Sequence, residues 1–415
     1  MKLPTCQTRV TVRVSLITVM ALFVLSTACG MLSYKPTVLE KQAGWLYSDV
    51  QQLAGTQANR AFGSLNGGFP THSENGSWVD DDDYSWAMGY YPAMLWLLYQ
   101  SNGDTTAVRL ANDWMVGLTP LKGIENRSGL GMIFYPTFVS AYQITGNRDY
   151  RQVALEAAET ASSRYTAAGY FPAWGEAGDT VLGRRLSIET LMDLDLLYWA
   201  SEASNDPTYA RKATSHAIFT VARLIDGEGK ILHVADFDPQ TGAIYGERTP
   251  ELADNQQYAA RGYSASSVWA QGQAWAIYGL ASAYRHDQKS LFLNAAMRAA
   301  DYLIENLPDD GIPLWDFELP SNADKKKDSA AAAVAAAGLM KLSRLTAIPE
   351  KSKLYQETAV RIVTALNNSY ISTDDAGILN QGVWGKRGSM GLSGATSWGD
   401  YYYLEALLLM QDIRA

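Results

Sequence analysis

The sequence predicts an all-α protein, an (α/α)6 barrel of six helical hairpins with long loops at one rim. Two observations favour this fold. Along the 415 residues a helical unit recurs, consisting of an aromatic-rich or small-residue helix, a short polar turn and an alanine-rich amphipathic helix. The composition is 47% hydrophobic, so the chain can bury a large core.

Residues 1–29 are expected to form a signal peptide. Basic residues precede an apolar run at 14–25, and small residues follow it, which is the pattern of an export signal. The stretch before Cys29 is similar to a bacterial lipoprotein processing site and would equally suit ordinary signal cleavage. We therefore expect an exported bacterial protein, periplasmic or an outer-membrane lipoprotein, in which residues 30–415 form the barrel catalytic domain.

Six segments have the character expected of the first helix of each hairpin. They are 86–100, 130–143, 188–201, 268–284, 328–342 and 397–411. Between most of them, turns with Asn, Gly and Asp end one helix and cap the next. Such hairpins can close into a ring, with the first helices inside and the second helices outside. An open solenoid of helix pairs is the alternative.

Inner helices that run in the same direction would bring their N-terminal ends to one rim. That rim would carry Trp86, Glu189, Trp269, Asp328 and Trp398. A solenoid would have no reason to gather aromatic residues at one end, so the closed ring is favoured. Two long connectors, 227–262 and 368–396, are rich in Gly and turn residues. Long loops on a rigid scaffold commonly carry function.

Charge and composition exclude some functions. The net charge is −9 and basic residues cluster only at 325–327, which argues against binding to nucleic acid. Cys6 and Cys29 are the only cysteines, so the mature domain has no internal disulfide and no thiolate metal site. The 12 Trp and 24 Tyr favour a cleft for hydroxylated ligands, with packing between helices as the simpler alternative.

Six stretches resemble the unsaturated glucuronyl hydrolases of glycoside hydrolase family 88. They are 192–213, 232–242, 262–284, 311–317, 328–339 and 397–407. The resemblance implies an (α/α)6 barrel that hydrolyses terminal 4,5-unsaturated uronic acid from lyase-generated oligosaccharides by hydration of the enol ether. It implies no metal and no other cofactor. The expected partner is a uronic-acid-containing oligosaccharide or polysaccharide, with a membrane contacted only through an N-terminal lipid anchor.

The family's acidic positions match this chain unevenly. The resemblance places Glu189 where the family has its catalytic aspartate, the general acid and base. Such a group needs a raised pKa to hold a proton near neutral pH, and the apolar neighbours of Glu189 are expected to raise it. Glu189 also begins a helix, where the helix dipole alone favours a carboxylate. The family's second carboxylate falls on Gly129, which has no side chain.

The resemblance also indicates substrate-binding positions. His233 corresponds to a histidine that contacts the substrate in the family. Gln271 stands where the family has an arginine, and we expect Arg261 to reach the same pocket and pair with a uronate carboxylate through its planar fork. The expected aromatic and polar contacts are Trp86, Trp269, Trp275, Ser397 and Trp398. Ser397 would equally serve as an N-cap.

The missing carboxylate leaves a second enzyme class open. A polysaccharide lyase neutralises the uronate with Arg, Asn or Gln and removes the C5 proton with Tyr or His. The chain supplies those residue types as Arg261, Gln271, Asn255, His233, Tyr258 and Tyr263. The candidate catalytic residues are therefore Glu189, His233 and Tyr263. A third hypothesis is a surface glycan-binding lipoprotein without activity.

Overall fold

Inner and outer helices alternate along the chain in the computed structural model. It describes residues 50–58, 61, 64–65, 68–80, 84–176, 178–245, 260–384 and 393–411. The expected signal peptide lies outside the described residues, as do Asn255 and Tyr258. Within the described ranges, no helix combines the length and the apolar character needed to cross a bilayer.

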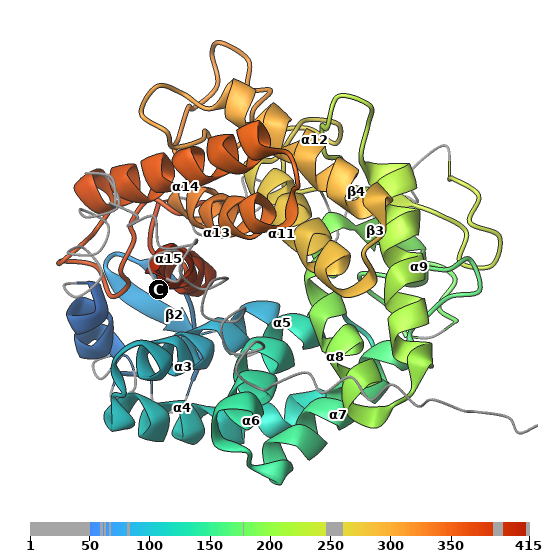
Figure 1. The fold of residues 1–415 in the computed structure, drawn as a ribbon, viewed down its shortest axis with the longest axis horizontal. Coiled ribbons are helices and arrows are strands. Elements are labelled where there is room, and N and C mark those ends of the chain that lie inside the picture. The colour runs from blue at the N-terminus through green and yellow to red at the C-terminus, as the bar shows by residue number, and fades with distance from the viewer. Residues whose placement is uncertain are drawn as a thin grey trace, which may run out of the picture.

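Six inner segments begin at one rim of the ring. They are η1 (Trp86–Gly89) with α3 (Tyr90–Asn102); α5 (Leu130–Phe134), η3 (Tyr135–Val139) and α6 (Ser140–Thr145); η5 (Ile188–Asp193) with α8 (Leu194–Ser204); α11 (Ala270–Asp287); α13 (Ser329–Leu345); and α15 (Ser397–Gln411). The outer helices are α4 (Thr105–Leu118), α7 (Arg148–Ser163), α9 (Pro207–Leu224), α12 (Ser290–Asn306) and α14 (Pro349–Ser369). Figure 1 shows these outer helices around the inner ring.

The ring closes because α15 packs against both α13 and α3. Residues 50–58, at the start of the described chain, form a further helix that belongs to none of the five hairpins. The side chain of Gln57 in that segment donates to the carbonyl oxygen of Gly377 at 2.6 Å, beyond the end of α14. The predicted barrel is confirmed, but no outer helix follows α15 in the described ranges, so these residues form five hairpins and not six.

Short turns connect the first five inner segments to the outer helices that follow them. Gly103 ends α3 with a φ of 73°, a left-handed conformation that glycine adopts without strain. Asp104 then accepts a hydrogen bond from Thr106 N at 2.8 Å and caps α4. Asn147 and Asp206 cap α7 and α9 in the same way. These turns leave the longer connectors at the opposite rim.

The α13 helix is buried on every side. Residues 330–337 are fully buried between α11, α14 and α15, and all but one of them are alanine. A Cβ at Gly338 would lie 3.1 Å from Tyr278 N, so the backbones of α13 and α11 come very close. Small residues therefore let the inner helices pack tightly enough to form a closed ring.

Two predicted inner helices are irregular. Residues 130–143 were expected to be one helix, but a π-helical turn, η3, interrupts them between α5 and α6. Pro136 lies in that turn and has no N–H to donate to the helix. The segment that starts at Ile188 begins as the 3₁₀ helix η5, which positions Glu189 in a tighter turn.

The long connectors at the rim contain small strands and turns. β1 (Pro70–Glu74) pairs antiparallel with β2 (Ser77–Asp80) ahead of η1. The 3₁₀ turn η2 (Thr119–Gly123) follows α4, and η4 (Leu182–Arg184) leads into β3 (Arg185–Ser187), which pairs antiparallel with β4 (Val234–Asp236). This second pair lies directly before the predicted acid at position 189.

Candidate active site

The pairing of β3 with β4 brings Glu189 and His233 together. Ser187 is opposite Val234 in this ladder, and Ile188 N donates to His233 O at 3.0 Å. At the other end of the ladder, Arg185 and Asp236 form a bidentate ion pair at 2.6 and 2.7 Å, with both side chains buried. The register of two short strands thus sets the position of the candidate acid.

One oxygen of the Glu189 carboxylate is held by two side chains. Ser187 Oγ donates to Glu189 Oε2 at 3.0 Å, and His233 Nε2 lies 3.3 Å from the same oxygen. The other oxygen, Oε1, is buried without a hydrogen-bond partner in the described part of the chain, and Arg261 Nε lies 4.0 Å from it. Oε1 is therefore the atom with capacity for a new bond.

The backbone around His233 selects its tautomer. Arg261 N donates to His233 Nδ1 at 2.9 Å, so Nδ1 accepts and carries no proton. The proton of the neutral ring then lies on Nε2, which donates to Glu189. Burial lowers the pKa of His233, which keeps the ring neutral. His233 therefore acts as a fixed hydrogen-bond donor, and Trp269 supports its ring edge-on with centroids 4.8 Å apart.

Arg261 supplies the positive charge beside Glu189. Its guanidinium carbon lies 5.3 Å from the ring centroid of Trp384, in a cation–π contact. The side chain of Arg261 is 20% exposed and that of Glu189 is 10% exposed. The guanidinium is therefore held in place on an aromatic face and is accessible to a ligand.

The pKa of Glu189 differs from the expectation. Burial raises the pKa, but the hydrogen bond from His233, the positive charge of Arg261 and the Ser187 hydroxyl outweigh it, and the net shift is below the ordinary value. The expectation that apolar neighbours raise this pKa is thus wrong for the free protein. Sequence alone did not show the polar groups that converge on Glu189.

Gly129 could not carry the family's second carboxylate. Its φ is 106°, and a Cβ there would lie 2.6 Å from Trp86 Cβ. The carboxylate of Asp193 accepts instead from the N–H groups of Gly129 and Gly131, each at 2.8 Å, at the start of α5. Burial raises the pKa of Asp193 to about 6. Its oxygens are used to hold α5 against η5.

An aromatic cluster lies beneath the rim, with Trp86 at its centre. The Trp86 ring contacts Trp398 at 5.0 Å, Trp275 at 6.1 Å and Trp384 at 6.3 Å between centroids. Trp384 also contacts Trp398 and His72 edge-on. The cluster therefore joins three predicted aromatic positions to the face that holds Arg261.

Several predicted substrate contacts are buried. Trp269, Gln271, Trp275, Ser397 and Trp398 are each at most 1% exposed. The amide nitrogen of Gln271 donates to Asp328 and to Val383 O, and the hydroxyl of Ser397 donates to Ala87 O at 3.3 Å. Gln271 and Ser397 thus make structural hydrogen bonds. A direct substrate contact for the five stays a prediction.

Tyr263 lies apart from the two hydrogen bonds on Glu189 Oε2. It is 38% exposed, its N–H donates to Asp316 at 2.8 Å, and its ring lies 6.4 Å from that of Trp315. Sequence reasoning missed Ser187 and Trp384. A serine two residues before a glutamate is an N-cap signal that could have indicated Ser187. Nothing in the sequence marked Trp384, which lies in a loop.

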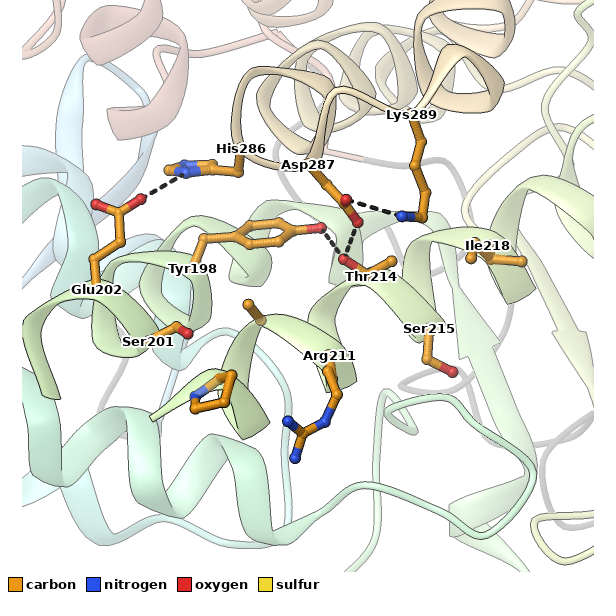
Figure 2. Close-up of a pocket in the computed structure, with 12 residues that line it drawn as sticks. Tyr198, Ser201, Glu202, Arg211, Thr214, Ser215, Ile218, His286, Asp287 and Lys289 are labelled. Carbon is orange, nitrogen blue, oxygen red and sulfur yellow. Dashed lines mark hydrogen bonds and ion pairs between the residues drawn. The ribbon is translucent and has the colours of Figure 1, made fainter. Parts of the chain in front are cut away.

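A separate groove of about 600 Å³ lies between α8, α9 and the turn after α11 (Figure 2). Figure 2 shows Lys289 paired with Asp287 at 2.9 Å and His286 directed toward Glu202 at 3.6 Å. None of the predicted site residues is among the described residues that line it. The charged side chains of this groove are largely paired with one another. It is therefore a weaker candidate for the active site than Glu189 with Ser187, His233 and Arg261, which we call the Glu189 cluster.

Within the described ranges, no group of three or more His, Cys, Asp or Glu is arranged to hold a metal ion. The chemistry available in the Glu189 cluster is that of one carboxyl group, a fixed hydrogen-bond donor and a nearby cation. Such a set can transfer a proton to a substrate and bind a negatively charged group next to it.

The chain is similar to known hydrolases of unsaturated sugars. The sequence profile of Glycosyl Hydrolase Family 88 matches residues 64–412. The unsaturated glucuronyl hydrolase of Bacillus sp. (strain GL1) is 33% identical over 355 residues, which cover 83% of this chain and 91% of that protein. The unsaturated chondroitin disaccharide hydrolase of Streptococcus pyogenes serotype M1 is 30% identical over 351 residues, 82% of this chain and 85% of that protein.

Solved structures show the same fold. The crystal structure of the Bacillus sp. GL1 unsaturated glucuronyl hydrolase superposes with a TM-score of 0.80 at 31% identity, and covers 88% of this chain and 96% of its own. A second structure, of an unsaturated glucuronyl hydrolase specific for heparin, gives a TM-score of 0.79 at 26% identity, with 89% and 98% covered.

Proposed function

This chain belongs to glycosyl hydrolase family 88, and we propose that it removes a terminal 4,5-unsaturated uronic acid from oligosaccharides left by polysaccharide lyases. The observation that carries the proposal is the Glu189 carboxylate, with Oε2 fixed by Ser187 and His233 and Oε1 without a partner beside Arg261. The relatives act on sugars of this class, as their names state.

The arrangement fits hydration of an enol ether. A neutral Glu189 would carry its proton on Oε1, because Oε2 accepts the hydrogen bonds of Ser187 and His233. Oε1 would protonate C4, and the resulting carboxylate would take a proton from the water that adds to C5. The C5 hemiketal then opens to a ketone, the C1–O bond of the aglycone breaks, and the alcohol leaves. One water molecule is consumed.

Arg261 explains how an acid with a low pKa can hold a proton when it is needed. A substrate uronate paired with the guanidinium would neutralise the charge that lowers the pKa of Glu189. The uronate would also place a like charge near the carboxyl group, which raises its pKa further. Substrate binding therefore favours the protonated acid, whereas the free protein keeps Glu189 ionised near neutral pH.

Glu189→Gln tests the proposal. Glutamine keeps the shape but cannot transfer the proton, so the rate should fall by roughly 10²–10⁴-fold. The measurement is the loss of ultraviolet absorbance of the C4=C5 bond when an unsaturated disaccharide is supplied. Glu202→Gln, at an exposed glutamate on α8, is the control and should keep the wild-type rate.

Two results would contradict the proposal. A Glu189→Gln variant with the wild-type rate would remove Glu189 from the chemistry. If absorbance instead increased when a saturated polyuronate was supplied, the enzyme would be a lyase, and Tyr263→Phe or His233→Ala should then stop the increase.

We also propose that residues 1–29 direct export, with Cys29 as the site of lipid attachment. The wild-type protein should then be in the membrane fraction, and Cys29→Ser should release it or leave its signal uncleaved. Equal release of both proteins into the soluble exported fraction would mean ordinary signal cleavage. An uncleaved wild-type protein in the cytoplasm would contradict export.

A further inference from the structure

A second cavity lies inside the barrel, below the rim that carries Glu189. It has a volume of about 300 Å³ and is lined by residues from all six inner segments. Its lining includes Gln100, Gln143, Arg285 and Lys341, which lie near the C-terminal ends of α3, α6, α11 and α13. Because the inner helices start at the rim, this rear cavity opens toward the opposite end of the barrel.

An aromatic layer separates the rear cavity from the candidate active site. Tyr90 and Tyr402 line the cavity, and their hydroxyls lie 3.1 Å apart. Above them, Tyr90 contacts Trp86 at 6.0 Å and Tyr402 contacts Trp275 at 5.5 Å between ring centroids. The Glu189 cluster lies on the far side of this layer, so a ligand in the rear cavity would not touch it.

The cations of the rear cavity already have anionic partners. Lys341 Nζ lies 3.0 Å from Glu405 Oε1, and Arg285 Nη2 lies 3.5 Å from Asp195 Oδ1. Asp195 also accepts from Ser282 at 2.6 Å and lies 3.1 Å from His286 Nε2. Two positive and two negative charges balance, so another anion would have no unpaired cation to bind.

Hydrogen-bonding capacity is nevertheless left over. Glu405 Oε1 accepts from Tyr278 at 2.9 Å, but its Oε2 is buried without a partner in the described part of the chain. Gln100 and Gln143 add exposed amides at the mouth. Tyr135 lies in the π-helical turn η3, and such turns occur frequently at functional sites.

We propose that the rear cavity is a second carbohydrate site that binds one uncharged sugar unit. Flat tyrosine faces, amides and a carboxylate oxygen match the apolar faces and hydroxyls of a neutral pyranose. The balanced charges disfavour a uronate, in contrast to the Arg261 site. Ordered water is the alternative occupant, since a polar cavity of this size would hold about ten water molecules. The site does not depend on the activity proposed for Glu189.

Glucose and glucuronate are the probes, because they share a ring and differ by the C6 carboxylate. Binding to the full chain is measured by saturation-transfer NMR with titration. Glucose should bind to the wild type and equally to Glu189→Gln, because Glu189 does not line the rear cavity. Arg261→Met should weaken the binding of glucuronate and leave that of glucose unchanged. Glu405→Gln should weaken glucose binding about tenfold, as expected when a charged acceptor of a hydroxyl is lost.

Gln143→Trp provides a second variant, because this exposed residue at the cavity mouth can be enlarged without touching the buried ion pairs. It should block glucose and leave hydrolysis unchanged. Glu202→Gln, outside the rear cavity, is the matched control and should bind glucose normally. The proposal is overturned if glucose does not bind to the wild type, if Glu189→Gln abolishes binding, or if Gln143→Trp leaves it unchanged.

Discussion

Glu189 reaches its position with one methylene more than the aspartate it replaces in the family pattern. The end of this longer side chain is held at Oε2, which accepts hydrogen bonds from Ser187 Oγ and His233 Nε2. Ser187 also accepts from Glu189 N at 3.3 Å, so the same hydroxyl contacts the residue at both ends. A longer acid can thus be held as firmly as a shorter one if a neighbouring hydroxyl fixes its far end.

Ser187→Ala is predicted to change the pH dependence. The hydroxyl stabilises the ionised form of Glu189, so its loss raises the pKa of that carboxyl group. Because the acid must be protonated to act, the high-pH limb of kcat/KM should move to higher pH. The removal of one positioning hydrogen bond should also lower kcat by about tenfold. Initial rates across pH give both quantities.

Ser187→Thr is the matched control, since threonine keeps the hydroxyl and suits a strand. It should restore the wild-type pH limb. If Ser187→Ala lowered kcat but left the limb in place, the hydroxyl would only cap η5, and its predicted effect on Glu189 would be wrong.

At the residue scale, sequence patterns identified the charged groups and missed their partners. Glu189, His233 and Arg261 were all predicted, and the structure brings them within 4.0 Å of one another in a chain of contacts. Their electrostatic effect depends on distances that spacing along the chain does not give. The sign of the Glu189 pKa shift was therefore predicted wrongly, although the residue was chosen from the sequence.

The β3–β4 ladder is the element that sets the active-site geometry. It is very short, and the Arg185–Asp236 pair holds it with both side chains buried. Arg185→Met or Asp236→Leu would leave the other charge buried and unpaired, which should lower the free energy of unfolding by about 3–5 kcal/mol. Urea unfolding followed by circular dichroism measures this loss.

The double variant Arg185→Met/Asp236→Leu is the control for the ladder. Because it removes both charges, it should be more stable than either single variant. A double variant whose loss equals the sum of the two single losses would show that the residues act independently. The register of Glu189 against His233 would then have another cause.

Helix periodicity predicted the inner elements well, but not their internal breaks. The expected segments 328–342 and 397–411 correspond closely to α13 and α15. Segment 130–143 divides at Pro136 because tertiary packing accommodates a π turn there. The contact of residues 50–58 with the loop after α14 could not be predicted either, since Gln57 and Gly377 lie far apart in the sequence and share no local pattern.

The whole ring distributes its functions between its two ends. At the rim, the long connectors carry His233, Arg261 and Trp384, which form the surroundings of Glu189. At the other end the connections are short turns, and the charged side chains of the rear cavity pair with one another. The aromatic layer between the two ends is formed by Trp86 on Tyr90 and by Trp275 on Tyr402.

The buried aspartates that stabilise this frame make the stability of the whole molecule pH-dependent. Burial raises the pKa of Asp328 to about 7 and that of Asp400 to about 8, although backbone N–H groups donate to both. An unfolded aspartate ionises near pH 3.8, so between these values the folded protein holds more protons than the unfolded chain. The free energy of unfolding must therefore fall as pH rises through this window.

The fall should be clearest between about pH 6.5 and 8. Burial lowers the pKa of His216 to about 3, which makes stability rise with pH only up to the ordinary histidine value near 6.5. Above it the two aspartates dominate, and the free energy of unfolding should decrease by about 2 kcal/mol.

Urea titrations at several pH values measure how the free energy of unfolding changes with pH. Asp400→Asn should make this dependence shallower, whereas Asp309→Asn, at an exposed position, should leave it unchanged. Stability that rose from pH 6.5 to 8 would mean that both aspartates are ionised in the folded protein, held by the N–H groups of Val383, Ile378 and Leu379.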